Sequence, residues 1–214
     1  MKSTSHIENL LMDYSKIEKT NYKAKVQFYE ERRNKISELL TRDKLELDVD
    51  YAFALFELGK YGKCLGILNI LVEVVITENI FTKDDEDIFQ VLLFKKSACH
   101  YNLGEPEKSM HVLQELIKMN PKNEGYKIFF KRCLRNEFKL AYRWMGGLVV
   151  GLFLLAAFII SVELLIVRPF YYDSAYIVEI TRNSIFAGAI LVLVSREYLF
   201  HRSFTKRLSF LTKA

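Results

Sequence analysis

A run of 24 residues, from Trp144 to Val167, contains a single charged residue, Glu163. A helix of this length rises about 36 Å, which exceeds the roughly 30 Å hydrocarbon core of a bilayer. The alternative is a buried helix of a water-soluble protein, but such helices seldom run so long without polar residues. The run therefore predicts a transmembrane helix.

A second apolar stretch extends from about residue 177 to 194 and is less uniform. Glu179 and Arg182 lie in its first turns, and extending the stretch to Phe200 takes in Arg196 and Glu197. We expect a second span, with a re-entrant or interfacial helix as the alternative. The connecting segment carries aromatic residues typical of a membrane–water interface. They are Phe170, Tyr171, Tyr172 and Tyr176.

Glu163 lies near the end of the first apolar run, five residues before Arg168. A carboxylate inside a membrane is costly unless it is paired or reaches the interface. We expect Glu163 to pair with Arg168 or to extend towards the interface, and a proton-relay role is the alternative.

Basic residues gather beside both apolar stretches, and we expect them to contact anionic lipid. Five recur at intervals of four before the first stretch, and three follow the second: Lys127, Lys131, Arg135, Lys139, Arg143, Arg202, Lys206 and Arg207. A solvated face is the alternative. The net charge of +5 is therefore expected to favour binding to anionic lipid, and we expect no nucleic-acid partner. Residues 201–214 are expected to form a basic amphipathic tail on the inner leaflet.

The distribution of these charges predicts the topology. Because positively charged flanks stay inside, both termini are expected to be cytoplasmic, in an integral protein of a bacterial inner membrane. The first 30 residues contain no apolar core of signal-peptide length, so we do not expect secretion by that route.

Small residues four apart occur in both apolar stretches. Gly147 and Gly151 form a GxxxG pattern, and Ser184 and Gly188 repeat the spacing. Such residues allow helices to approach closely. They are expected to pack helices, either within one hairpin or between copies of the chain as a homo-oligomer.

Residues 1–143 mix charged and apolar residues and predict an all-α fold. Apolar residues at helical spacing indicate one helix near Leu10 and Tyr14, with Thr4 or Ser5 as its cap, and a second helix from Tyr22 to Leu40. Neither this region nor the rest of the chain contains a P-loop, GxSxG, HExxH or Rossmann pattern. We therefore expect no enzymatic activity, no catalytic residues, no cofactor and no metal site. The three cysteines are expected to be buried and reduced.

Two segments share a plan of helix, Leu-Gly turn and second apolar helix: "YAFALFELGKYGKCLGILNILVE" and "KSACHYNLGEPEKSMHVLQELIK". Both resemble the tetratricopeptide repeat. Gly59 and Gly104 match the turn glycine, Ser97 and Ser109 match small-residue positions, and Pro121 matches the closing proline. The turn glycines are 45 residues apart rather than 34, which predicts a polar insertion around "TENIFTKDDEDI". The fold class predicted is an all-α, tetratricopeptide-like array of helical hairpins plus two transmembrane helices.

The resemblance implies that a peptide or partner helix binds along the first helices of the repeats. The matching positions are Val49, Phe53, Phe56, Phe94, Ala98, Tyr101 and Asn102. Because these side chains are mostly apolar or aromatic, an apolar or helical ligand is expected. Packing of the phenylalanines against the N-terminal helices is the alternative.

These expectations divide the chain into four parts. They are a cytoplasmic tetratricopeptide-like domain (1–125), a basic juxtamembrane helix (126–143), a transmembrane hairpin (144–200) and the amphipathic tail (201–214). The function that we predict is a membrane-anchored adaptor that recruits a protein partner. The alternative is a membrane-active effector whose hairpins oligomerise and permeabilise the membrane.

Overall fold

The computed structural model describes residues 10–80, 82–83, 86–171 and 175–213, and the chain divides into two compact units at Cys133 and Leu134. The described residues are helical apart from turns and a two-residue antiparallel ladder, which confirms the all-α prediction. Thr4, Ser5 and Tyr172, to which we assigned a cap or an interfacial position, lie outside the described residues.

The first unit opens with short helices packed on one long helix. Residues 10–15 are helical, and α2 (Tyr22–Glu31), α3 (Arg33–Ser37) and α4 (Thr41–Glu57) follow. Buried Leu10, Phe28, Ile36, Leu39 and Leu47 form a small core between these segments.

One helix had been expected from Tyr22 to Leu40, and that expectation is wrong. The helix is interrupted at Arg32, whose φ of −113° and ψ of 15° are not helical. Its guanidinium lies 4.2 Å from the centre of the Phe28 ring, and the break turns Ile36 into the core. Leu40 is 74% exposed and precedes the first residue of α4.

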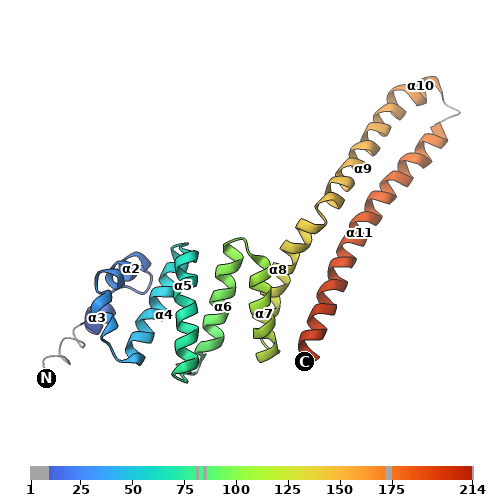
Figure 1. Ribbon diagram of the computed structural model, residues 1–214. Coiled ribbons are helices and arrows are strands. Elements are labelled where there is room, and N and C mark those ends of the chain that lie inside the picture. Colours follow the sequence, from blue (N-terminus) through green and yellow to red (C-terminus); the bar gives the residue numbers. More distant parts are fainter. Residues whose placement is uncertain (1–9, 81, 84–85, 172–174, 214) are drawn as a thin grey trace, which may run out of the picture. The chain divides into compact units, whose positions relative to one another are not determined.

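Helices α4 to α7 form two helix–turn–helix pairs that stand side by side (Figure 1). They are completed by α5 (Tyr61–Thr77), α6 (Ile88–Asn102) and α7 (Pro106–Met119). The main core lies where α4, α5 and α6 meet, and Ala52, Leu55, Cys64, Leu68 and Leu92 are fully buried in it. Strands β1 (Thr82–Lys83) and β2 (Glu86–Asp87) pair between α5 and α6, within the segment expected to be a polar insertion.

The turns between paired helices have the glycine geometry that the sequence predicts. Gly59 has a φ of +73° and Gly104 a φ of +78°, which an L-residue with a side chain seldom adopts. Ser97 and Ser109 are fully buried in α6 and α7, where small side chains let the helices approach.

Helix α8 (Glu124–Ala141) contains the division between the units, and the second unit continues with α9 (Arg143–Val162). A π-helical turn, η1 (Glu163–Val167), and the short α10 (Arg168–Phe170) follow. The chain then returns in α11 (Ala175–Lys213), which lies beside α9 (Figure 1). Helix α11 is unbroken at Phe200, so residues 201–213 continue the same helix. We call α9, η1, α10 and α11 the apolar hairpin.

The apolar hairpin contains two helical segments long and apolar enough to cross a membrane, Arg143–Phe170 and Ala175–Leu211. Few residues in either apolar window are buried. Large side chains such as Leu154, Phe158, Leu165 and Leu191 are 65–73% exposed. The described residues therefore leave most of the apolar surface of the hairpin uncovered, unlike that of a buried pair of core helices.

We predict opposite effects for two glycine-to-alanine changes in the first unit. Gly104→Ala places a side chain at positive φ and should cost about 1 kcal/mol. Gly66 lies inside α5 with open space around its Cα, so Gly66→Ala should stabilise by about 0.5–1 kcal/mol through helix propensity. Hydrogen exchange of the full chain, followed by mass spectrometry, would measure both. Equal protection of the α6–α7 peptides in wild type and Gly104→Ala would contradict the turn geometry.

Candidate functional site

The face formed by the first helices of the two pairs carries an aromatic and cationic cluster. The Nζ atom of Lys95 on α6 lies 4.8 Å from the centre of the Phe53 ring and 4.2 Å from that of Phe56, both on α4. The same ammonium is 3.4 Å from Oε1 of Glu57. Such contacts hold a long lysine side chain over the rings. We call Phe53, Phe56, Glu57 and Lys95 the aromatic face.

Further along the array, α8 covers the corresponding positions of α6. The Phe94 ring lies 5.4 Å from Tyr126 and 5.6 Å from Phe129, and the Tyr101 ring lies 5.4 Å from Phe129. The guanidinium of Arg132 is 5.5 Å from the centre of the Tyr101 ring. Two of the aromatic residues expected to meet a ligand therefore pack within the first unit.

The remaining predicted positions are placed differently from one another. Val49 is 5% exposed and belongs to the main core. Asn102 is exposed, and its side-chain amide donates a hydrogen bond of 2.9 Å to the Ala98 carbonyl. Partner binding by these residues stays a prediction, and Phe53 and Phe56, which are half-buried against the main core, are its best-placed part. Sequence reasoning missed Lys95 and Arg132, because their ring contacts cross between helices.

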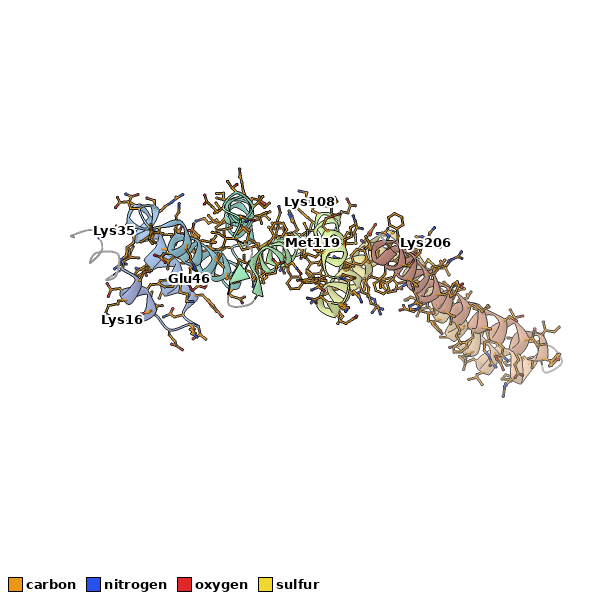
Figure 2. All side chains as sticks on the ribbon, turned by 90° about the horizontal axis from the view of Figure 1, so that it is seen from below. Lys16, Lys35, Glu46, Lys108, Met119 and Lys206 are labelled. Atoms are coloured by element: carbon orange, nitrogen blue, oxygen red, sulfur yellow. The ribbon has the colours of Figure 1, made fainter. Side chains whose placement is uncertain are left out.

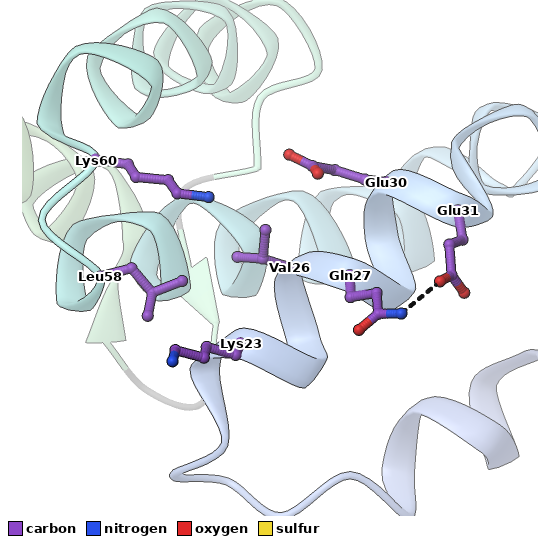
Figure 3. Close-up of a pocket in the computed structure, with 7 residues that line it drawn as sticks. All are labelled: Lys23, Val26, Gln27, Glu30, Glu31, Leu58 and Lys60. Carbon is purple, nitrogen blue, oxygen red and sulfur yellow. Dashed lines mark hydrogen bonds between the residues drawn. The ribbon is translucent and has the colours of Figure 1, made fainter.

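A groove between α2 and the α4–α5 pair was not predicted. It contains a cavity of about 650 Å³ (Figure 3). Its lining mixes both charge signs with apolar atoms: Lys23, Val26, Gln27, Glu30, Glu31, Leu58 and Lys60. Gln27 donates a 2.7 Å hydrogen bond to Glu31 at one edge. A neighbouring cavity of about 590 Å³ shares Glu30 and extends along Gly62, Gly66 and Ile70 of α5.

Two stacked tyrosines, Tyr29 and Tyr51, lie between the neighbouring cavity and the main core. The Tyr29 and Tyr51 rings are stacked with centroids 3.9 Å apart, and their hydroxyls donate to Asp48 and Glu30 respectively. Burial and the hydrogen bond to Glu30 raise the pKa of Tyr51 to about 12, so the phenol remains a donor at neutral pH. Burial also raises the pKa of Asp48. This arrangement can hold a segment that carries both polar and apolar side chains.

The eight predicted lipid-contacting residues divide between paired and unpaired side chains. Lys127 pairs with Glu124 at 2.7 Å, Arg135 with Glu197 at 3.1 Å and Arg207 with Glu137 at 3.2 Å. Lys131 is exposed. Lys139, Arg143, Arg202 and Lys206 are exposed, and no described carboxylate pairs with them. Lys206 lies on the outer surface of α11 (Figure 2).

The predicted small-residue positions do not make the contact between α9 and α11. A Cβ atom added at Gly147, Gly151 or Gly188 would meet no atom within 4 Å, and Ser184 is exposed. Buried Ala156 and Ala189 and the Phe153–Phe186 ring pair, 5.3 Å apart, form the intrachain interface instead. Of the two alternatives, packing between copies of the chain stays a prediction.

Glu163 is the most buried charged side chain that the structure describes, at 1% exposed. Its Oε1 accepts hydrogen bonds of 3.2 and 2.9 Å from Nε and Nη2 of Arg168. Its Oε2 accepts one of 2.7 Å from Nη1 of Arg182 on α11. Arg182 also lies 3.8 Å from Glu179. We call these four residues the charge cluster. Pairing with Arg168 agrees with the sequence-based expectation, whereas Arg182 was missed because it is 19 residues away.

The buried cysteines do not form a reactive site. Cys64 and Cys99 are fully buried with their sulfur atoms 3.4 Å apart, and both are free thiols. The hydrogen bond with Cys99 and burial raise the pKa of the Cys64 thiol. Within the described ranges, no three His, Cys, Asp or Glu side chains are grouped so that they could hold a metal ion.

No family model, curated protein sequence or solved structure matches this chain. The contacts described above are therefore the basis for assigning a function.

We predict that Glu163 and Arg182 are energetically coupled. Arg182→Gln leaves a buried carboxylate with one partner and should cost about 2–4 kcal/mol, whereas Glu163→Gln combined with Arg182→Gln should cost less than the sum of the single changes. Hydrogen exchange of α9 and α11 in detergent micelles would measure the protection. Arg168→Gln is the matched control, because the Arg168 side chain is 56% exposed and should contribute less. Additive costs within about 0.5 kcal/mol would contradict the coupling.

Proposed function

We propose that this protein is a membrane-anchored adaptor whose first unit recruits a protein partner. The observation that carries the proposal is the division of the chain into an array of paired helices and a separate hairpin of two membrane-length helices. An exposed apolar surface of this extent on a helix pair needs an apolar environment. A lipid bilayer supplies that environment to the hairpin.

Aromatic residues near both ends of the apolar stretches in α9 and α11 support a bilayer location. Trp144 and Tyr198 are 65% and 62% exposed at one end, and Phe170, Tyr171 and Tyr176 are 64–76% exposed at the other. Tyr176 and Tyr198 are about 33 Å apart along α11 at 1.5 Å per residue. This spacing matches the distance between the two interfaces of a bilayer, where Trp and Tyr side chains are most favourable.

The charges support one orientation in that bilayer. Four cations without a described acidic partner lie towards the end of the hairpin that is opposite the loop: Lys139, Arg143, Arg202 and Lys206. At the loop end, by contrast, Arg168 and Arg182 are both paired with Glu163. Retention of positive charge on the inner side supports a cytoplasmic location for the first unit and for the C-terminal end of α11.

The first unit supports an interaction role through its tetratricopeptide-like arrangement. Three features support that resemblance: the two turn glycines, the buried small residues Ala52, Ser97 and Ser109, and the end of α7 just before Pro121. Repeats of this kind present their first helices to a ligand, and here that surface is the aromatic face. Two half-buried rings beside an ammonium that is already paired with Glu57 favour a segment that offers apolar side chains.

The adaptor hypothesis predicts that recruitment depends on the aromatic face and not on the sequence of the hairpin. A photo-crosslinking residue at Glu57, with Lys118 on α7 as the control position, would detect a partner in the producing cells. Crosslinking should persist when residues 144–200 are replaced by an unrelated two-span hairpin. It should fall more than tenfold in Phe53→Ala/Phe56→Ala, since an aromatic anchor is worth about 2 kcal/mol. Crosslinking lost with the exchanged hairpin, or retained without the rings, would overturn the adaptor hypothesis.

A second candidate function, a membrane-active effector, is favoured by the outward position of Gly147 and Gly151. Both glycines lie on an open surface of α9, where a second hairpin could approach closely. In this hypothesis the first unit senses a signal or oligomerises, and the associated hairpins permeabilise the membrane.

The effector hypothesis predicts that the full chain dissipates a membrane potential across lipid vesicles. Gly147→Ile/Gly151→Ile should abolish this activity by preventing close helix contact, without disturbing the intrachain interface. Ala157→Ile, another exposed small-to-large change on α9, is the matched control and should leave the activity in place. A potential-sensitive dye would report the result. An intact potential in the presence of the wild-type protein would exclude this function.

A further inference from the structure

A small cavity lies within the second unit, between the end of α8 and the part of α11 that follows the apolar stretch. Its volume is about 100 Å³. It is lined by Arg135, Phe138, Lys139, Arg196, Glu197 and Phe200. Three cations face one carboxylate, so the lining has a net charge of +2. A cavity of this size admits a phosphate group with few waters and is too small for a peptide.

A cation–π contact and one ion pair hold the Arg135 guanidinium in place. The Arg135 guanidinium lies 4.9 Å from the centre of the Phe200 ring and donates a 3.1 Å hydrogen bond to Glu197. The Phe138 and Phe200 rings pack edge to face at 5.5 Å. A guanidinium has five N–H donors, so the bond to Glu197 leaves most of those of Arg135 available to an anion.

Arg196 also lines the cavity, and it is not among the eight residues predicted to contact lipid. It is half-buried, and no described carboxylate pairs with it. Its Nη1 lies 3.7 Å from the position that a Cβ atom would take at Gly146. The guanidinium therefore lies within van der Waals range of this position on α9, and only a side chain that extends beyond Cβ would compete with it for space. Lys139 on the α8 side likewise has no acidic partner in the described part of the chain.

The depth of the cavity identifies the source of the anion. Trp144 and Tyr198 mark one interface in the proposed bilayer. Trp144 is two residues from Gly146 in sequence, and Tyr198 is two residues from Arg196. Lipid phosphates lie at that level, next to the hydrocarbon core. A positive site at the cytoplasmic end of a helix pair is suited to an anionic headgroup.

We propose that this cavity is a binding site for the phosphate group of an anionic phospholipid, held by Arg135, Lys139 and Arg196. The site rests on the proposed function, because the cavity reaches lipid only if the hairpin spans a bilayer. Its ligand is the phosphodiester of a lipid whose headgroup has no compensating cation, such as phosphatidylglycerol. Phosphatidylcholine presents a quaternary ammonium beside the same phosphate and fits a cationic cavity less well.

The sole tryptophan of the chain, Trp144, is a probe for this site. The full-length protein is placed in nanodiscs that contain equal mole fractions of phosphatidylglycerol and phosphatidylcholine. Bromine is carried on the acyl chains of one lipid or of the other, because brominated chains quench a nearby indole. We expect the quenching to report a preference of about fivefold for phosphatidylglycerol.

Substitutions separate a defined site from general surface charge. Arg196→Gln and Lys139→Gln should each remove most of the preference. Gly146→Ile should do the same without changing the charge, because its side chain displaces the Arg196 guanidinium. Arg202→Gln removes one charge from the same helix about 9 Å further along, near the Debye length, and should reduce the preference less than twofold. An equal loss in Arg202→Gln and Arg196→Gln, or a full preference in Gly146→Ile, would overturn the site.

Two further measurements are needed. One tells a lipid phosphate from a soluble phosphate, and the other tells a failure of the proposed site from a failure of the proposed membrane location. Replacing chloride with inorganic phosphate at equal ionic strength should leave the preference unchanged. If phosphate abolishes it, the ligand is a soluble phosphate and the lipid assignment is wrong. Equal quenching by both lipids refutes the site while supporting the span, whereas no quenching by either refutes the membrane location itself.

Discussion

The structure depends most on the fact that two helices alone cannot bury the apolar surface that α9 and α11 carry. Each helix has one face towards the other, and side chains such as Leu154, Phe158 and Leu191 remain exposed on the rest. This surface requires an apolar surrounding, and a bilayer is the environment that we propose. The exposed aromatic side chains near both ends and the unpaired cations at one end are then explained by a single location.

Within the hairpin, the polar loop end specifies the alignment more strongly than the apolar middle. Ala156, Ala189 and the Phe153–Phe186 pair permit close contact, but apolar surfaces of similar shape tolerate a shift along the axis. The bond from Arg182 to the buried Glu163 requires one alignment, and the exposed pair of Arg135 on α8 with Glu197 on α11 adds little to it. A shift by one turn would separate Arg182 from Glu163 by about 5.4 Å and leave Glu163 buried with Arg168 alone.

Local sequence signals predicted the elements well and their mutual contacts poorly. The length of the apolar runs, the glycines at 59 and 104 and the small residues at 97 and 109 each act through their own helix or turn, so their placement could be predicted. The break at Arg32 could not, because it depends on how Ile36 packs against Leu10 and Leu47. The contacts of Lys95, Arg182 and Arg196 were missed for the same reason: each contact is made with a neighbour from another helix. Gly147 and Gly151 show the converse, since their spacing indicates close packing without indicating a partner.

The charge cluster has a consequence for the synthesis of the protein. Glu163 emerges from the ribosome five residues before Arg168 and 19 residues before Arg182. A nascent α9 therefore presents a carboxylate whose second arginine does not yet exist, and translocating it alone is unfavourable. Once Arg182 has emerged, Glu163, Arg168, Glu179 and Arg182 sum to zero charge. In a bilayer, the two helices are thus best inserted together as a preformed pair, with the charge cluster crossing as a neutral unit.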